Sequence, residues 1–356
     1  MQFAQQASAG GDVINLVSTQ ACSDVISGPA KVYRNLAKGL GLIGYPYVVN
    51  RALGSTSRVW VHDDPVALRY VSRSGARAVV GPNLFVLPRD IPPQTDLAGM
   101  LYVHPSPWVI AVWTAAGFDA CPMAAWPVGI DLDELHPTKP PEARYGVLVY
   151  HKLRRRDELQ RIRDSLDRAA VPHEVVRYGF YDQADYVNAL RDTCLVVWHG
   201  RHESQGIALQ EALAMDVPVL VCDVKSMSEE EGGAFPPELD ELPATAAPYF
   251  DTRCGWRTYA LDDVGGMAAQ MLAERSSFSP REYVEENLSL EAQARRFVAL
   301  WEHFGLTLEE GFSERSKSNK AWREPNGTKV LEFIERARSG IRTRIGGGRL
   351  GGPKGS

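Results

Sequence analysis

The chain has 356 residues, 44% hydrophobic and 23% charged, which is typical of a globular protein and enough for two domains. It has no run of eighteen apolar residues, and its first residues lack the basic start and apolar core of a secretory signal, which argues against membrane-spanning and secreted classes. The five cysteines form no Cys-x-x-Cys pair, which indicates reduced thiols. We therefore expect a cytoplasmic protein.

The net charge of −5 is unevenly distributed. Segment 313–356 carries eleven Lys/Arg and four Asp/Glu, a net +7, so the rest of the chain is near −12. Because the body is acidic, we expect no nucleic-acid partner. Apolar residues recur at helical spacing from Val330 to Ile345 among arginines. This pattern is compatible with peripheral contact to the inner face of a membrane, although a flexible, partly helical basic tail is the favoured interpretation.

The first part of the chain alternates apolar runs with helical periodicity, which predicts a doubly wound α/β domain at 12–138. Strands are predicted at 13–17, 46–49, 58–62, 77–80 and from 101, and helices up to 42, from 65 and up to 117. No Gly-x-Gly-x-x-Gly follows the first strand, which argues against a dinucleotide dehydrogenase.

A polar, Pro-rich stretch at 138–142 predicts a linker to a second α/β domain at 143–305. Its strands are expected at 146–150, 175–179, 195–198, 217–221 and 247–250. Helices are expected up to 170, through 190, and at 261–274, 280–288 and 290–304. The last helix is expected to cross back to the first domain.

The most informative stretch is 194–223, CLVVWHGRHESQGIALQEALAMDVPVLVCD, which predicts a strand, a loop, a helix and a second strand. Glu203 stands at the mouth of the helix and Glu211 lies two turns inside it. Eight residues at about 100° each place the two carboxylates on roughly the same helix face. Each carboxylate can accept hydrogen bonds from sugar hydroxyls.

The residues between these carboxylates are predicted to form the first helical turn: Ser204, Gln205, Gly206, Ile207 and Ala208. A helix N-terminus presents unpaired N–H groups and the positive end of a dipole, which suits a diphosphate. A glycine there lets an anion approach the backbone closely. An ordinary βαβ unit with two surface carboxylates is the alternative interpretation.

The Glu-x7-Glu spacing at a helix opening, followed by Glu-Ala and a Pro-Val-Leu strand, resembles the donor site of retaining GT-B glycosyltransferases of the family 4 type. The resemblance implies two Rossmann-like domains facing a central cleft. It implies that Glu203 lies against the transferred sugar, that Glu211 holds the ribose, and that the amides near Gly206 and Ile207 hold the diphosphate. No cluster of His, Cys and carboxylates has metal-ligand spacing, so no metal is expected.

In the same family, a basic pair after the first strand of the second domain binds the diphosphate. Lys152 is the best match for the first cation and Arg156 or Arg155 an approximate match for the second; a solvated basic helix start is the alternative. Tyr178 and Gly179 follow the next strand, where family members contact the base.

Candidates in the first domain also come from the resemblance. In the family the first loop faces the donor phosphates and the acceptor, so the candidates here are Ser27, Gly28 and Lys31; a plain connecting loop is equally compatible. The family often has a histidine after the fourth strand, but here Asn83 stands there and His62 lies one strand earlier, so the sugar-contacting group stays open. Gly129 is expected beside the donor cleft. Asp63 or Asp64 is interpreted as a possible helix cap.

The function predicted is retaining transfer of a sugar from a nucleotide diphosphate sugar to a hydroxyl, in glycan or glycoconjugate biosynthesis. The acceptor is an unknown glycan, lipid-linked or small molecule, and no cofactor is expected besides the nucleotide-sugar co-substrate. The family's leaving phosphate is described as the base, which fits the lack of a clear nucleophile–base pair. Two alternatives stay open: a sugar-nucleotide epimerase of similar architecture, and a non-catalytic sugar-nucleotide-binding scaffold.

Overall fold

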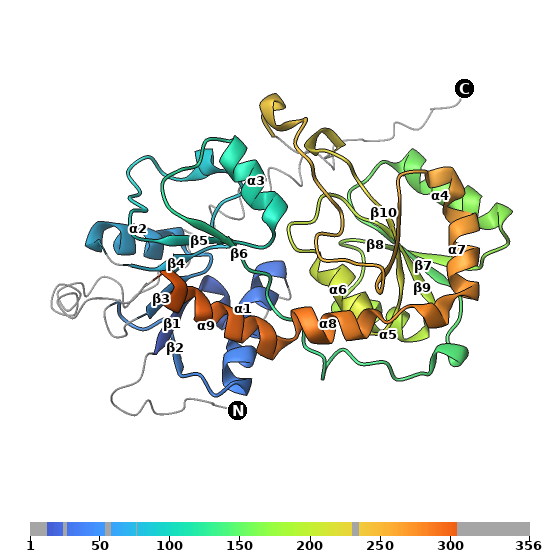
Figure 1. Ribbon diagram of the computed structural model, residues 1–356, viewed down its shortest axis with the longest axis horizontal. Helices are drawn as coiled ribbons and strands as arrows, with labels where there is room; N and C mark the ends of the chain where they lie inside the picture. Colours follow the sequence, from blue (N-terminus) through green and yellow to red (C-terminus); the bar gives the residue numbers. More distant parts are fainter. Residues whose placement is uncertain (1–12, 24–26, 54–57, 76, 230–234, 305–356) are drawn as a thin grey trace, which may run out of the picture.

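The computed structural model describes residues 13–23, 27–53, 58–75, 77–229 and 235–304. Figure 1 shows two lobes side by side, each with a parallel sheet between helices. The predicted tail at 313–356 and its amphipathic helix lie outside the described residues. In the described part of the chain, no helix is long and apolar enough to cross a bilayer.

The first sheet has six parallel strands in the order β2-β1-β3-β4-β5-β6. The strands are β1 (Ile14–Val17), β2 (Tyr47–Val49), β3 (Arg58–Val61), β4 (Val79–Val80), β5 (Leu101–His104) and β6 (Met123–Ala125). Most of their residues are buried, as expected of parallel strands covered on both faces by helices.

Four helices cover this sheet. α1 (Gly28–Leu42) and α9 (Leu290–Phe304) pack together on one face, and α2 (Pro65–Ser74) and α3 (Pro107–Ala115) cover the other. Asp64 caps α2 by accepting hydrogen bonds from two backbone N–H groups of its first turn, at 2.8 and 3.0 Å. The chain therefore returns to its first lobe in α9.

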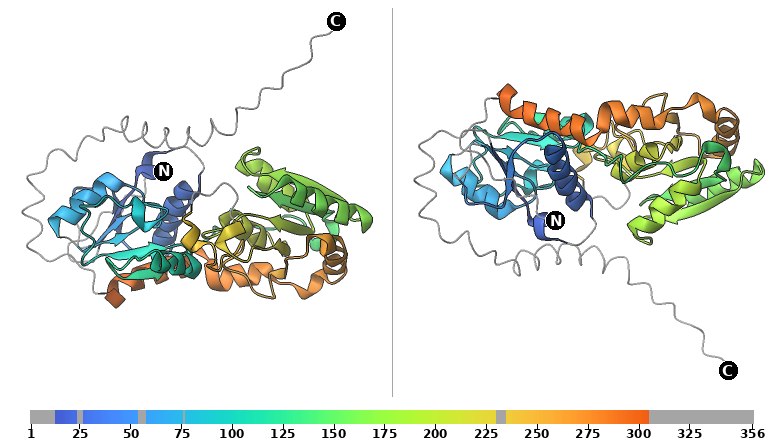
Figure 2. Two further views of the ribbon diagram at one scale, coloured as in Figure 1. Left: turned by 90° about the horizontal axis from the view of Figure 1, so that it is seen from above. Right: turned by 90° about the horizontal axis from the view of Figure 1, so that it is seen from below.

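The second sheet has five parallel strands in the order β11-β10-β9-β7-β8. The strands are β7 (Val147–His151), β8 (His173–Arg177), β9 (Leu195–His199), β10 (Val219–Cys222) and β11 (Gly255–Thr258). α4 (Arg156–Arg168) and α7 (Val264–Ala273) cover one face, and α5 (Gln183–Asp192), α6 (Ile207–Ala214) and α8 (Pro280–Leu288) cover the other. Figure 2 shows both lobes from two further sides.

Two local predictions are wrong. The strand expected at 247–250 is irregular: its aromatic residues pack on the core, and its first carbonyl accepts a 2.6 Å hydrogen bond from Arg257. The fifth strand is β11 instead, which begins at Gly255 with φ +135°, where a Cβ would lie 2.1 Å from the Val219 carbonyl oxygen. The helix expected from Ser204 begins only at Ile207, so Glu203 lies in the preceding loop rather than on the helix face.

Both sheets have a topological switch point. The order reverses between β1 and β3 in the first sheet and between β7 and β9 in the second, since crossovers on either side of these pairs run in opposite directions. In open parallel sheets, ligands bind outside the carboxyl ends of the strands at such a point. The fold therefore marks two places: the loops after β1 and β3, and the loops after β7 and β9.

The connection between the lobes is tightly packed at Gly129. A Cβ there would lie 2.6 Å from Leu290 Cα and 2.7 Å from the Ser289 carbonyl oxygen. The Gly129 carbonyl accepts a 2.7 Å hydrogen bond from Asn35 of α1. The start of α9 thus lies directly on the chain segment that leaves the first sheet.

We therefore expect Gly129→Ala to lower stability by about 1–3 kcal/mol, because the obstructing atoms are backbone that cannot move aside. Gly266→Ala is the matched control: it lies inside α7 with open space around its Cβ, and a helical alanine is more favourable than glycine by about 1 kcal/mol. Thermal unfolding of both variants measures the difference. Equal melting temperatures for wild type and Gly129→Ala would contradict the close approach.

Candidate functional site

The switch point of the second sheet brings Lys152 and Glu203 together, because one residue follows β7 and the other follows β9. Lys152 Nζ lies 2.7 and 2.8 Å from the two carboxylate oxygens of Glu203. The glutamate side chain is only 8% exposed. Its Oε1 is buried, and in the described part of the chain the Lys152 ammonium is its ionic partner.

Glu211 also has a lysine partner, and that lysine comes from the other lobe. Lys31, in α1, forms an ion pair with Glu211 of α6 and donates a 2.7 Å hydrogen bond to Gln183 Oε1 at the start of α5. Gln183 Nε2 in turn donates to Glu211 Oε2 at 3.2 Å. Because the Glu211 side chain is only 5% exposed, its charge needs such a counter-charge.

The turn between the two carboxylates has a mixed character. Gly206 is the N-cap of α6 with φ +79°, a conformation that favours glycine. Ser204 is exposed, and the helix N–H groups that begin at Ile207 and Ala208 point toward the loop. Gln205 is different: its side chain is buried and bonds both the N–H and the carbonyl of Val128, at 3.0 and 2.9 Å. Gln205 therefore joins the lobes.

The remaining candidates of the second lobe are spread around this pair. Lys152 Nζ lies 4.8 Å from the centre of the half-exposed Tyr178 ring. Gly179 is exposed with φ +83°. Arg156 is exposed at the first position of α4. The buried cation near the loop after β9 is Arg154, which donates to Glu158 at 2.9 Å and to the Gly200 carbonyl at 3.4 Å.

A partly buried polar cluster lies at the carboxyl ends of β7 and β9, next to Lys152 in the chain. His151 and His199 face each other with their Nδ1 atoms 3.1 Å apart, and His199 Nε2 lies 3.1 Å from Glu158 Oε2. Burial lowers the pKa of His151 to about 4, and the neighbouring His199 adds to this effect. Burial alone would raise the pKa of Glu158, but hydrogen bonds from His199 and Arg154 outweigh it and lower the pKa to about 2.

The candidates of the first lobe lie in three places. His62 and Asn83 are brought together, with His62 Nε2 2.8 Å from Asn83 Oδ1, at the ends of β3 and β4. Gly28 is exposed at the start of α1, less than one turn before Lys31. Gly129 is buried against α9, as described above.

Further contacts fix the loop that carries Glu203. Trp108 of α3 donates from its indole N–H to the Glu203 carbonyl at 3.0 Å, so the first lobe also holds this loop. The Glu203 N–H donates to the Thr245 carbonyl at 3.0 Å. Glu203 is therefore positioned from both lobes. Among the described residues, no group of three His, Cys, Asp or Glu side chains is arranged to hold a metal ion.

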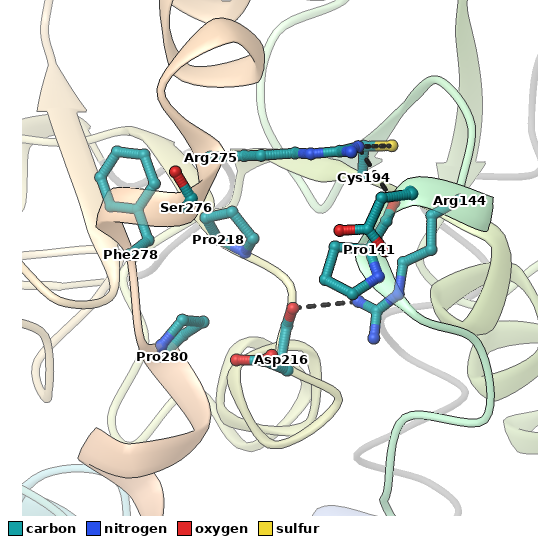
Figure 3. A pocket seen from close by; sticks show the side chains of 10 residues that line it. Pro141, Arg144, Cys194, Asp216, Pro218, Arg275, Ser276, Phe278 and Pro280 are labelled. Carbon is teal, nitrogen blue, oxygen red and sulfur yellow. Dashed lines mark hydrogen bonds between the residues drawn. The ribbon is translucent and has the colours of Figure 1, made fainter.

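A cavity of about 130 Å³ lies at the amino ends of β9 and β10, on the other end of the second sheet from Lys152 (Figure 3). It is lined by Arg144, Cys194 and Arg275, with Asp216 beside them. Arg144 donates to the Asp216 carbonyl at 2.9 Å, and Arg275 lies 3.8 Å from the Cys194 sulfur. It contains none of the predicted site residues and lies at the amino ends of the strands.

Known structures share this two-lobe arrangement. The chain matches Anabaena HepE in complex with UDP and glucose (TM-score 0.53, 12% identity, 82% of this chain and 100% of that one). It matches the catalytic domain of Arabidopsis thaliana starch synthase IV bound to ADP and acarbose (TM-score 0.54, 11% identity, 83% and 99%). The fold is that of the GT-B glycosyltransferases.

The lipopolysaccharide outer core galactosyltransferase WaaB also matches the GT-B fold of this chain (TM-score 0.52, 12% identity, 82% of this chain and 100% of that one). No protein-family profile and no curated protein sequence matches the chain. The expected resemblance to retaining GT-B enzymes of the family 4 type is therefore confirmed at the level of the fold.

We expect Lys31→Ala to destabilise the protein by about 1–3 kcal/mol, because it leaves a buried carboxylate, Glu211, without its counter-charge. Lys139→Ala is the control, since Lys139 pairs with Asp192 where both side chains are about half exposed, and such a pair contributes less than about 1 kcal/mol. Urea unfolding of both variants measures the two losses. A Lys31→Ala loss no larger than that of the control would contradict the structural importance of this ion pair.

Glu158 gives a pH-dependent prediction. Its pKa is lowered from 4.5 to about 2, so its contribution to stability is present above about pH 4.5 and is lost as the pH falls toward 2. Glu158→Gln should therefore show a shallower loss of stability over this range than the wild type, while exposed Glu282→Gln should follow the wild type. Melting temperatures at several acidic pH values test this, and parallel curves for wild type and Glu158→Gln would refute it.

Proposed function

We propose that this protein is a retaining glycosyltransferase that uses a nucleotide diphosphate sugar. The observation that carries the proposal is the pair of buried carboxylates, Glu203 and Glu211, on either side of the α6 N-terminus and each beside a lysine. The GT-B fold supports it, as do the complexes of HepE with UDP-glucose and of starch synthase IV with ADP. The proposed units are an acceptor domain at 12–138 and a donor domain at 143–305.

The lysine–glutamate pairs suggest how the donor is bound. A diphosphate that approaches the α6 N-terminus offers Lys152 stronger, doubly charged acceptors in place of the Glu203 carboxylate. Glu203, released from Lys152, then accepts hydrogen bonds from hydroxyl groups of the sugar. Glu211 exchanges contacts with Lys31 and Gln183 for the ribose hydroxyls.

The same groups serve the reaction. The bond from the sugar C1 to the β-phosphate oxygen breaks, and a bond from C1 to the acceptor oxygen forms on the same face. The acceptor proton passes to the departing phosphate oxygen, so no protein nucleophile is required. Lys152 and the N–H groups at Gly206, Ile207 and Ala208 stabilise the negative charge that builds on the diphosphate. Metal-independent catalysis in the cytoplasm is part of this proposal.

Other residues around the site have supporting roles in the proposal. Tyr178 and Gly179 are the proposed contacts of the base, and the Tyr178 ring centre lies 4.8 Å from Lys152 Nζ. Arg156 is available to the outer phosphate from the start of α4. Gly28 lies beside the donor phosphates on the first-lobe side, and His62 with Asn83 faces the acceptor.

A thermal-shift panel of UDP, ADP, GDP and their glucose, galactose and mannose derivatives tests donor binding. We expect at least one to raise the melting temperature of the wild type, because ligand that binds only the folded state stabilises it. Glu211→Ala should weaken this ligand at least tenfold, since ribose contacts are lost, and Glu282→Ala, an exposed acid on α8, should not. If no nucleotide shifts the wild type, the donor-site proposal fails.

A turnover assay distinguishes sugar transfer from the two alternative functions, epimerisation and binding without catalysis. The donor that binds is incubated with a mixed acceptor panel and analysed by mass spectrometry. Transfer gives a product heavier by one sugar residue, and Lys152→Ala should lower kcat at least a hundredfold, because leaving-group stabilisation is lost. A sugar nucleotide of unchanged mass but altered stereochemistry would indicate an epimerase, and binding without any product would indicate a scaffold.

A further inference from the structure

The cavity at the amino ends of β9 and β10 contains two arginines that no carboxylate neutralises. Arg144 and Arg275 both line it, and Figure 3 shows Arg275 reaching Cys194 and Arg144 reaching the Asp216 carbonyl. In the described part of the chain, neither guanidinium forms an ion pair with an Asp or Glu side chain, although Glu142 and Asp216 lie on the wall of the same cavity. Two cations therefore share one hollow without a direct counter-charge.

Arg144 is held by backbone groups alone. The residue is only 7% exposed, and it donates from Nε to the Lys139 carbonyl at 3.3 Å and from Nη1 to the Asp216 carbonyl at 2.9 Å. Its Nη2 donates to no described residue. Burial lowers the pKa of Arg144 and the charge of Arg275 acts in the same direction, although Asp216 opposes both. A nearly buried cation of this kind is stabilised by an anion that enters the cavity.

Arg275 reaches the same cavity from the segment that follows α7. Its Nη1 donates to the Pro141 carbonyl at 3.0 Å and to the Cys194 sulfur at 3.8 Å. Its Nε and Nη2 donate to none of the residues that the structure describes. Two guanidinium groups from distant parts of the chain thus converge on one cavity, each with N–H donors left for a ligand.

A tetrahedral oxyanion suits these donors best. A guanidinium fork binds phosphate oxygens in a bidentate manner, and a phosphate presents oxygens in several directions, so it can bridge two arginines at once. The cavity volume of about 130 Å³ is several times the ~30 Å³ that a water molecule occupies in the liquid, which leaves room for such an ion. Of the two acids on the wall, Glu142 is exposed, so solvent screens its charge, and the two arginines outweigh Asp216.

We propose that the Arg144–Arg275 cavity binds a phosphate group, either as inorganic phosphate or as the head of a phosphate monoester. The site lies at the amino ends of the strands, whereas Lys152 and Glu203 follow their carboxyl ends, so it is separate from the proposed donor site. The inference does not depend on the proposed function. The same arginines hold the carbonyls of Lys139 and Pro141, so the ligand would bind next to the segment that joins the lobes.

The first test compares melting temperatures in sodium phosphate and in sodium chloride of equal ionic strength. We expect phosphate to raise the melting temperature of the wild type by about 2–4 °C more than chloride does. Arg144→Gln and Arg275→Gln should lose this difference, because each removes one of the two forks. Arg163→Gln, an exposed arginine on α4, is the matched control and should keep it. Lys152→Ala should also keep it, because the site is not the donor site.

The second test uses the thiol of Cys194 and requires no substitution, so it does not depend on how the arginine variants fold. The wild type is treated with iodoacetamide, and the labelling rate of each cysteine is followed by mass spectrometry. At a phosphate concentration of twice Kd, labelling of Cys194 should be about threefold slower than in chloride, because a bound ion covers the thiol. Labelling of the exposed Cys22, in the first lobe, should not change.

The inference is wrong if phosphate stabilises the wild type no more than chloride, or if the Arg144 and Arg275 variants keep the difference. It is also wrong if Lys152→Ala alone abolishes the difference, or if phosphate leaves the labelling of Cys194 unchanged. Stabilisation by acetate but not by phosphate would contradict the ligand class. Glycerol 3-phosphate distinguishes the two sources: tighter binding than phosphate identifies a monoester, and weaker binding the free ion. The nucleotide thermal shift tests the proposed function separately.

Discussion

The candidate site is built around two buried carboxylates whose charge has to be neutralised. Glu203 and Glu211 are nearly inaccessible, and a buried charge is costly unless a counter-charge and hydrogen bonds accompany it. For Glu203 the counter-charge comes from the same lobe, whereas for Glu211 it comes from Lys31 in the opposite lobe. The second ion pair therefore joins the lobes at the same place where the chemistry is proposed to occur. A ligand that replaces Lys31 as the partner of Glu211 would therefore alter both the binding site and the contact between the lobes.

The sheet order explains why polar groups gather where they do. In each sheet the order in which strands are added reverses once. The loops that leave the two strands at this switch point run to opposite faces of the sheet, which leaves a space between them. In the second lobe this space holds the Lys152–Glu203 pair, and in the first it holds a hydrogen-bond network around Asp63. Two similar sheets thus carry two polar groups of different character: one with lysine–glutamate pairs, the other with amides and hydroxyls around a buried carboxylate.

Much of the fold could be predicted from local patterns. The helices at Pro280–Leu288 and Leu290–Phe304 have the bounds expected from apolar spacing and from the proline at the start of the first. Most strands of both sheets were expected within a few residues because buried parallel strands are continuous apolar runs. Two strands were not expected: the short, half-buried β6, and β11, whose place depends on Gly255 fitting against the Val219 backbone, an approach that no local pattern reports.

The candidate site was predictable only where its residues are close in sequence. Glu203, Glu211 and the turn between them lie within one βαβ unit, so their spacing was informative. The contact of Lys31 with Glu211 joins residues 180 positions apart, and the bonds of Gln205 to Val128 join residues 77 apart. Asp63 was interpreted with Asp64 as a helix cap; Asp64 has that role, and Asp63 instead joins the ends of β3 and β1 through Ser18 and Thr19. Such contacts arise from the packing of the lobes.

A crystal structure of the protein with a bound nucleoside diphosphate tests the central claim most directly. The account predicts that the ribose hydroxyls lie within hydrogen-bonding distance of Glu211 and that the diphosphate contacts Lys152 and the N–H groups at the start of α6. Both lysine–glutamate pairs would then be separated. A nucleotide bound elsewhere, for example at the Arg144–Arg275 cavity, with the pairs of Glu203 and Glu211 intact, would contradict it.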